Sequence, residues 1–275
     1  MRVLVAGGTG RLGRLVVSRL LERGVTVRVL TRDATRAGDL RDLGAEVVDG
    51  DVRKPETLPA ALQDVDVVVS AFHGFVGSGL SPESVDRDGN ANLVAAAQTA
   101  QVAVVLMSVV EAAADSPMVL FRCKAAAEEG LRASGVQWTI VRSAAFIELW
   151  AELVGKGIVF GRGENPINFV SVHDVADVVM DAVLDPSRRG QVIDVVGPER
   201  LTFNQLADRL RALDGRPRRV RHVPRGMLRL LAPLHRQPKA ALVMDTTDMT
   251  YRSVSGAHVG PTSPGQALAR AAAVR

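Results

Sequence analysis

The sequence contains a single cysteine, Cys123, and a single tyrosine, Tyr251, in 275 residues, and aromatic residues make up only 4% of it. One cysteine excludes an internal disulfide and a thiolate metal cluster, and we expect no metal site. No apolar run approaches the ~20 residues that cross a bilayer. Met1 leads directly into an expected strand and not into a signal peptide. These absences predict a cytoplasmic protein without a membrane partner.

The charged residues give a net charge of +4, and nearly all of the cations are arginines. They are densest between Arg209 and Arg229, which form either a solvated helix and loop or a contact with a phosphate or a partner. No recognition helix, zinc-ligand pair or interleaving of aromatic with basic residues accompanies them. We therefore expect no nucleic-acid partner.

Short apolar, β-branched runs alternate with helical patterns through the first half of the chain. Several runs are continuously apolar, which is typical of parallel strands buried on both faces. The expected strands are residues 3–6, 25–30, 45–48, 65–71, 102–108 and 137–141, and the expected helices are residues 12–23, 34–43, 57–62, 85–99 and 119–133. This order predicts an α/β fold of the Rossmann type, with a doubly wound parallel sheet.

The pattern weakens after residue 145 and divides the chain into three parts. Residues 1–145 are expected to form a dinucleotide-binding Rossmann core. Residues 146–250 are expected to complete the sheet and form a small C-terminal substrate lobe. Residues 251–275, rich in Ser, Gly, Pro and Ala, are expected to be a loosely ordered tail.

The strongest motif is the glycine-rich run of residues 7–13 (GGTGRLG), which lies where the first strand ends and the first helix begins. Glycines permit the tight turn and let the backbone approach a pyrophosphate, and the helix N-terminus supplies N–H donors to the phosphates. We assign nicotinamide dinucleotide binding to Gly7, Thr9, Gly10, Arg11, Leu12 and Gly13.

The end of the second strand distinguishes between the two nicotinamide dinucleotides. NAD enzymes usually place a carboxylate there to hold the ribose 2′-hydroxyl. Here Arg32 follows the strand and no carboxylate precedes Asp33. Arg32, helped by Arg11, can pair with a 2′-phosphate, so we favour NADP(H) over NAD(H). The alternative is that these arginines are surface residues only.

Further short segments follow the glycine turn in order. They are Gly50-Asp51-Val52, residues 69–72 (VSAF), Lys124 with Glu128, residues 139–142 (TIVR), residues 172–176 (VHDVA) and residues 197–199 (GPE). With these motifs at these spacings, the chain resembles the atypical short-chain dehydrogenase/reductase family, specifically its NmrA-like branch, from residue 1 to about residue 224.

The resemblance implies cofactor contacts beyond the glycine turn. They come from Asp51 and Val52 to the adenine, from Ser70, Ala71 and Phe72 to the ribose and nicotinamide side, and from Ala144 and Phe146 to the nicotinamide ring. Ser143 stands where the branch usually has proline, which leaves the path of that loop open.

Typical short-chain reductases have a proton-donating Tyr four residues before the active-site Lys. Here Leu120 precedes Lys124 at that spacing and the only tyrosine is Tyr251, so the usual acid is excluded. A Lys124 ammonium in a low-dielectric cleft could instead stabilise charge delocalised over a quinone or enone and relay a proton. The resemblance supports this role, since isoflavone-reductase-like relatives are thought to use a lysine similarly. Alternatively, Lys124 only binds the ribose or lies on the helix surface.

Two other residues are catalytic candidates. Ser108 stands at the position of the family's serine. His73 follows the fourth expected strand, at the edge where open α/β sheets bind ligands, and could donate a proton near neutral pH. The alternative for His73 is a hydrogen-bonded loop residue.

Large aromatic side chains are grouped in segments expected near the nicotinamide. Phe75, Trp150 and Phe160, with Phe72 and Phe146, could sandwich a flat substrate, or they could equally be core residues. A small aromatic molecule is the expected partner, and the sequence leaves a homodimer open.

The leading interpretation is an NADPH-dependent reductase acting on a quinone or a polycyclic aromatic ketone. The Arg- and Ala-rich, Lys-poor composition is typical of high-GC bacterial genomes, where this branch often tailors aromatic polyketides in antibiotic biosynthesis. The alternative is a non-catalytic NmrA-like sensor of NAD(P). An isomerase or epimerase is a third reading, and the missing tyrosine counts against it.

Overall fold

The computed structural model describes residues 1–74, 79–214, 220–251 and 256–273. The strands are β1 (Arg2–Ala6), β2 (Thr26–Thr31), β3 (Glu46–Asp49), β4 (Val67–Ser70), β5 (Ala103–Val109), β6 (Trp138–Ser143), β7 (Ile158–Phe160), β8 (Ile167–Asn168), β9 (Val192–Val196), β10 (Arg200–Leu201), β11 (Arg221–Val223) and β12 (His258–Val259). The α-helices are α1 (Arg11–Glu22), α2 (Gly38–Asp42), α3 (Leu58–Ala61), α4 (Asp88–Ala100), α5 (Val119–Ala133), α6 (Ile147–Gly155), α7 (Val172–Leu184), α8 (Phe203–Asp214), α9 (Arg225–Leu231), α10 (Arg236–Thr246) and α11 (Pro264–Ala273).

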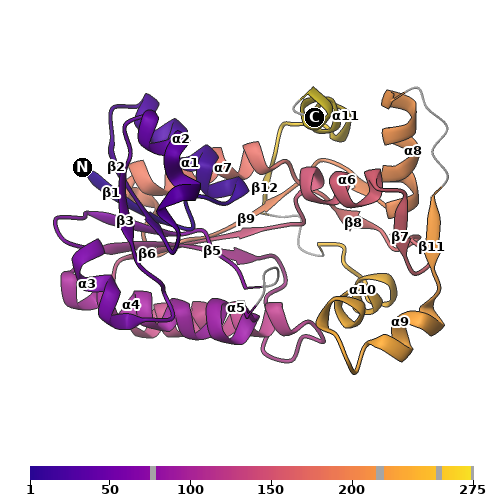
Figure 1. Cartoon of the computed structure of the whole chain (residues 1–275), viewed down its shortest axis with the longest axis horizontal. Helices are drawn as coiled ribbons and strands as arrows, with labels where there is room; N and C mark the ends of the chain where they lie inside the picture. The colour runs from indigo at the N-terminus through magenta and orange to yellow at the C-terminus, as the bar shows by residue number, and fades with distance from the viewer. Residues whose placement is uncertain (75–78, 215–219, 252–255, 274–275) are drawn as a thin grey trace. The chain divides into compact units, whose positions relative to one another are not determined.

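Eight strands form one sheet in the order β12-β9-β6-β5-β4-β1-β2-β3. The neighbours of β1 are β2 and β4, both parallel to it, with Val3 opposite Val27 on one side and Val67 on the other. Helices α1, α2 and α7 cover one face, and α3, α4 and α5 cover the other (Figure 1). The predicted doubly wound parallel sheet is confirmed.

The apolar runs form this sheet because both of its faces are covered. Val3, Leu4, Val5 and Ala6 of β1 are all fully buried. On one face, Leu4 and Val68 pack in a core with Leu93 of α4 and Leu131 of α5. Burial of such side chains contributes about 1.5–3 kcal/mol each, which explains why continuous apolar runs predicted these strands.

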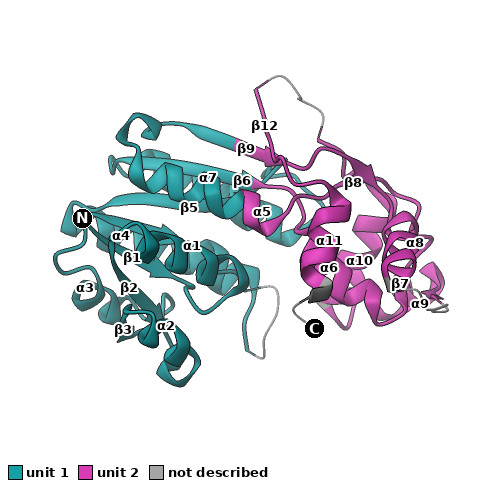
Figure 2. Cartoon of the chain, turned by 90° about the horizontal axis from the view of Figure 1, so that it is seen from above, with its two compact units in different colours: residues 1–142, 175–193 teal, residues 143–174, 194–275 magenta. Residues whose placement is uncertain are grey.

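The chain forms two compact units (Figure 2). Residues 1–142 and 175–193 make up unit 1, and residues 143–174 and 194–275 make up unit 2. Unit 1 therefore includes residues 175–193, which lie within the 146–250 region that was expected to complete the sheet and form the substrate lobe. Among the described residues, no helix combines the length and apolar character needed to cross a bilayer.

The segment expected to be a loose tail contains regular structure in unit 2. Strand β12 pairs in parallel with β9, and α11 follows with Leu268 fully buried. Thr262 anchors the link between them, because its N–H and its hydroxyl donate to the buried Asp174 carboxylate at 3.0 Å and 2.5 Å. Composition alone missed this anchor because it depends on a carboxylate far away in the sequence.

The turn between β1 and α1 requires glycine at two positions. Gly7 has φ +89°, and a Cβ there would lie 2.6 Å from the carbonyl oxygen of Ala71. At Gly13 a Cβ would lie 2.2 Å from the carbonyl oxygen of Gly7. Backbone cannot yield to such a contact as a flexible side chain could. The turn thus packs the start of α1 directly against the ends of β1 and β4.

We predict that Gly13→Ala lowers the free energy of unfolding by about 1–3 kcal/mol, because the added methyl group overpacks a backbone contact. Gly130→Ala is the matched control, since Gly130 is an exposed position in α5 with no atom within 4 Å of an added Cβ. The control should gain about 0.5–1 kcal/mol from helix propensity. Urea unfolding measures both, and equal effects of the two substitutions would contradict this account of the turn.

Candidate functional site

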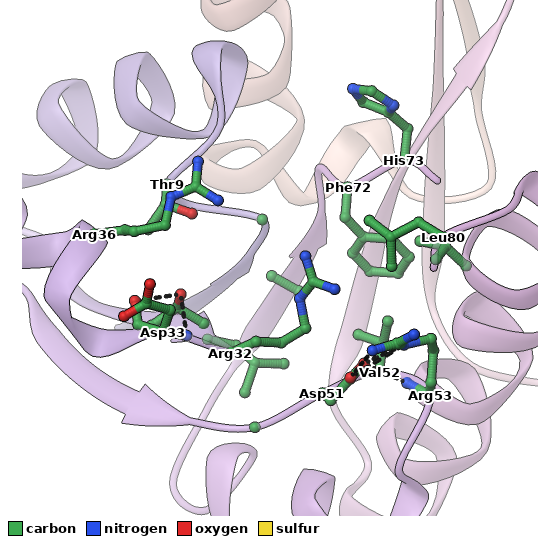
Figure 3. A pocket seen from close by; sticks show the side chains of 16 residues that line it. Thr9, Arg32, Asp33, Arg36, Asp51, Val52, Arg53, Phe72, His73 and Leu80 are labelled. Carbon is green, nitrogen blue, oxygen red and sulfur yellow. Dashed lines mark hydrogen bonds and ion pairs between the residues drawn. The ribbon is translucent and has the colours of Figure 1, made fainter. Parts of the chain in front are cut away.

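A pocket of about 330 Å³ opens in unit 1 at the carboxyl ends of β1 to β4 (Figure 3). The sheet order reverses between β1 and β4, and open α/β sheets bind ligands at this switch point. The lining residues are Ala6, Gly7, Thr9, Leu30, Thr31, Arg32, Asp33, Arg36, Gly50, Asp51, Val52, Arg53, Phe72, His73, Leu80 and Val85. Six of the positions in unit 1 that were assigned to the cofactor therefore line one pocket: Gly7, Thr9, Arg32, Asp51, Val52 and Phe72.

The glycine turn forms one side of the pocket. Gly10 caps α1 without a side chain, and no acidic residue occupies the first helical turn. The first N–H groups of the helix have no intrahelical partner, so the helix N-terminus can accept an anionic ligand. Leu12 is buried behind the turn, and Arg11 begins α1 without lining the pocket.

Arg14, which sequence reasoning missed, connects this turn to the segment after β2. Its Nε donates to the Thr9 carbonyl at 3.2 Å and its Nη2 to the Arg36 carbonyl at 2.7 Å, and it pairs with Asp39. Such a network holds two walls of the pocket together. No local motif signals it, because an arginine in the first helix is ordinary.

Two arginines stand on the side of the pocket formed after β2. Arg32 and Arg36 are exposed and line the pocket, with Arg36 beside Thr9 and Arg32 nearer the centre (Figure 3). Between them in sequence, Asp33 accepts from the Thr35 hydroxyl at 2.5 Å and N–H at 3.0 Å, and these bonds lower its pKa. Its carboxylate is thereby engaged in its own turn, and the two guanidinium groups suit a phosphate.

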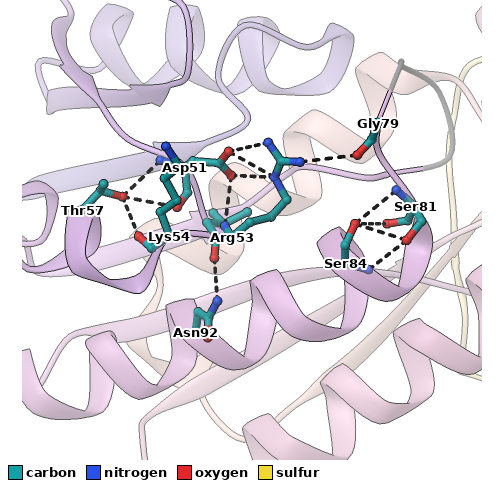
Figure 4. Close-up of polar contacts among 9 residues, drawn as sticks. Asp51, Arg53, Lys54, Thr57, Gly79, Ser81, Ser84 and Asn92 are labelled. Atoms are coloured by element: carbon teal, nitrogen blue, oxygen red, sulfur yellow. Dashed lines mark hydrogen bonds and ion pairs between the residues drawn. The ribbon is translucent and has the colours of Figure 1, made fainter.

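Asp51 is paired with Arg53, a residue that the sequence analysis did not single out (Figure 4). The Arg53 Nη2 and Nε atoms lie 2.6 Å and 3.1 Å from Asp51 Oδ2, and Nη1 donates to the Gly79 carbonyl at 3.4 Å. Burial raises the pKa of Asp51, but hydrogen bonds and charge from Arg53 outweigh it and leave the pKa lowered. A planar guanidinium thus borders the region implied for the adenine. The Val52 carbonyl accepts from Asn92 at 2.9 Å.

Lys124 lies on α5 and forms a buried ion pair with Asp86. Its Nζ is 2.9 Å from Asp86 Oδ1 and 3.4 Å from the Phe72 carbonyl oxygen. Only 5% of the lysine side chain and none of the aspartate side chain is exposed. The interpretation of Lys124 as a helix-surface residue is therefore wrong, and its carboxylate partner was missed, because no sequence pattern links the two positions.

His73 lies at the edge of the pocket (Figure 3), and the charges of both Asp86 and Lys124 act on it. Burial lowers its pKa; the Asp86 carboxylate opposes the shift, and the Lys124 ammonium adds to it. The net direction is downward, so a neutral imidazole is favoured. Ser70, the last residue of β4, is fully buried, and its hydroxyl donates to Asn90 Oδ1 at 2.6 Å.

The Ser108 hydroxyl is one of several donors around the buried Glu128 carboxylate. Its hydroxyl donates to Glu128 Oε1 at 2.6 Å, and Glu128 also accepts from Arg142 at 2.8 and 2.6 Å and from Arg132 at 2.9 Å. Burial raises the pKa of Glu128, but these cations and hydrogen bonds outweigh it. The hydroxyl hydrogen of Ser108 is thereby committed to an ionised carboxylate.

The remaining assigned residues belong to unit 2, apart from Phe75, which lies outside the described residues. Ala144 is buried and Phe160 is partly exposed. Phe146 caps α6, and Trp150 of that helix packs on Phe203 with ring centroids 5.0 Å apart. Tyr251 is also in unit 2, where its hydroxyl donates to Asp194 at 2.5 Å.

Known proteins match most of this chain in sequence. A family described as NAD(P)H-binding matches residues 7–186. The NAD(P)H azoreductase of Xenophilus azovorans is 35% identical over 227 residues, covering 80% of this chain and 76% of that protein. The photosystem II assembly factor Ycf39 of Synechocystis is 32% identical over 238 residues, covering 84% and 73%.

Solved structures share the fold at lower identity. The triphenylmethane reductase of Citrobacter aligns with a TM-score of 0.79 at 21% identity, over 98% of this chain and 99% of that one. An NADPH-dependent quinone oxidoreductase of Escherichia coli, solved with NADPH, aligns with a TM-score of 0.74 at 20% identity, over 98% and 99%. The chain thus belongs to the NAD(P)H-binding family, in agreement with its resemblance in sequence to the NmrA-like branch of the atypical short-chain dehydrogenase/reductases.

Proposed function

We propose that the protein is an NADPH-dependent reductase that transfers hydride to a quinone or a polycyclic aromatic ketone. The observation that carries the proposal is the buried Lys124–Asp86 pair, whose charges both act on His73, a residue that lines the pocket. The wider family includes an NAD(P)H azoreductase relative, and reduction of a conjugated acceptor is common to azo dyes and quinones.

The pocket fits a nicotinamide dinucleotide. Gly7 and Thr9 of the glycine turn line it, and the uncapped start of α1 suits the pyrophosphate. Asp51, Val52 and Arg53 would border the adenine. When bound, the cofactor supplies the hydride. The protein supplies binding, orientation and proton management.

Preference for NADPH rests on the two exposed arginines after β2. Arg32 and Arg36 would hold the 2′-phosphate, while Asp33 Oδ1 is already bonded to the Thr35 N–H and hydroxyl. Arg11 begins α1 outside the pocket lining, so we assign the phosphate to Arg32 and Arg36 first.

Reduction of a quinone needs a proton donor for the oxygen that gains charge. Lys124 is the donor in this proposal, since its ammonium is buried and points to the end of β4. His73, favoured neutral by burial, would donate a hydrogen bond to the acceptor. Ser108 would hold Glu128 in place and would not donate a proton, because its hydrogen is committed to that carboxylate.

We further propose a flat aromatic acceptor, a biosynthetic step and a cellular location. Phe146, Trp150 and Phe160 would contact a flat acceptor. By analogy of composition, aromatic polyketide tailoring in antibiotic biosynthesis is the proposed biological step. A cytoplasmic location completes the proposal, which leaves a homodimer open.

A second function is a non-catalytic NAD(P) sensor whose partner responds to the bound cofactor. The Ycf39 relative, described as an assembly factor, favours it. The deciding experiment is anaerobic NADPH oxidation by the purified protein with menadione, a polycyclic quinone and an azo dye. Turnover of a quinone supports the reductase. Tight NADPH binding without turnover of any acceptor would support the sensor instead.

Lys124→Met should lower kcat for the preferred quinone by about 100-fold or more, in line with loss of a general acid. NADPH affinity, measured by fluorescence titration, should change only a few-fold. Lys156→Met is the matched control, because Lys156 is an exposed lysine of unit 2. Undiminished turnover in Lys124→Met would remove this lysine from the proposed chemistry.

Arg32→Ala should raise KM for NADPH by about 10-fold or more and leave KM for NADH nearly unchanged. The reason is that a hydrogen bond to a charged group contributes about 1.5–3 kcal/mol. Arg36→Ala should act in the same direction, and Arg41→Ala, an exposed arginine of α2 outside the pocket lining, should not. Steady-state kinetics with both cofactors checks this, and equal losses for NADPH and NADH would argue against a 2′-phosphate site.

A further inference from the structure

We propose that Asp86 is a positioning residue for the reduction: it holds the Lys124 ammonium at the end of β4 and balances its charge, so that Lys124 acts by giving up a proton and not as an uncompensated cation. This inference rests on the proposed reductase function. It assigns a role to a carboxylate that the sequence motifs did not point to.

The two carboxylate oxygens of Asp86 have different partners. Oδ1 is 2.9 Å from Lys124 Nζ, and Oδ2 accepts the Gly74 N–H at 2.8 Å. Lys124 in turn approaches the Phe72 carbonyl at 3.4 Å. The carboxylate therefore fixes both the ammonium and the backbone on either side of His73, the segment that borders the pocket.

Asp86 is itself held rigidly. It lies in a π-helical turn, Pro82–Arg87, which leads into α4 and begins with a reciprocal Ser81–Ser84 capping box. The Asn90 side chain donates to the Asp86 carbonyl at 2.7 Å and accepts from the Ser70 hydroxyl at 2.6 Å. The bonds of Asn90 to Asp86 and to Ser70 are both buried, so the end of β4, the turn and α5 share one polar network.

A charge-balanced pair changes what Lys124 can contribute. An ammonium with a carboxylate at 2.9 Å offers little net positive field to a bound anion, because the two charges largely cancel at a distance. It retains N–H bonds that can transfer a proton. In the step, the acceptor receives the hydride, NADPH is oxidised to NADP⁺, one N–H bond of Lys124 breaks and an O–H bond forms on the reduced acceptor. Solvent then returns the proton to the amine.

Several titratable groups surround the Lys124–Asp86 pair. His73 faces it from the segment after β4, and burial lowers the pKa of that imidazole. Cys123 precedes Lys124 on α5, where burial together with Glu83 and Asp86 raises the pKa of its thiol. Arg87, on the same turn as Glu83, opposes this shift. Within the described residues, Asp86 is the carboxylate in direct contact with Lys124.

The test compares Asp86→Asn, which keeps the shape and removes the charge, with Asp86→Glu, which keeps the charge. Asp88→Asn is the matched control, because Asp88 is two residues away in an exposed pair with Arg87. With menadione and NADPH, Asp86→Asn should lower kcat about 10- to 100-fold with little change in KM for NADPH. Asp86→Glu should restore part of the rate.

A second measurement separates this inference from the proposed function. Competitive labelling with acetic anhydride, followed by peptide mass spectrometry, reports the reactivity of each lysine without any turnover. Lys124 should label several-fold faster in Asp86→Asn than in the wild type, relative to the exposed Lys54. If the wild type reduces no acceptor, the proposed function fails, while labelling still tests the pairing. Unchanged kcat and unchanged labelling in folded Asp86→Asn would overturn the role of Asp86.

Discussion

The approach of Gly7 to the backbone of Ala71 constrains the arrangement of the whole first unit. A side chain at Gly7 would lie 2.6 Å from that carbonyl oxygen, so β1, β4 and the start of α1 meet at this distance only because glycine is present. The same meeting point is where the sheet order reverses. The pocket, the helix terminus and the Phe72–Gly74 segment all take their positions from it.

Charge is arranged around the pocket so that the acidic groups are already neutralised or bonded. Asp51 pairs with Arg53, Asp86 pairs with Lys124, and Asp33 is bonded within its own turn. Arginines on the β2 side are left to face an incoming anion. This pattern serves a ligand that carries several negative charges at one end and a neutral, reactive ring at the other.

The fold and the cofactor motif were predictable because their signals are local. Continuous apolar runs indicated strands covered on both faces, and the glycine spacing of residues 7–13 located the turn at the end of the first strand. Lys124 could be singled out by a family motif. Asp86, Arg53 and the anchor between Thr262 and Asp174 could not, because each depends on contacts that only the tertiary fold creates. Composition misled most at the C-terminus, where an Ala-rich stretch is a packed helix.

The interleaving of the two units along the chain has a consequence for biosynthesis. Unit 1 needs residues 175–193, which the ribosome delivers only after the first segment of unit 2 has emerged. Unit 2 must in turn wait for α11, whose Leu268 is fully buried close to the end of the chain. Each unit consists of two separate stretches of the chain, so neither can complete its packing until its second stretch has been synthesised. The nascent protein therefore exposes apolar surface that belongs to its core until α11 has emerged from the ribosome.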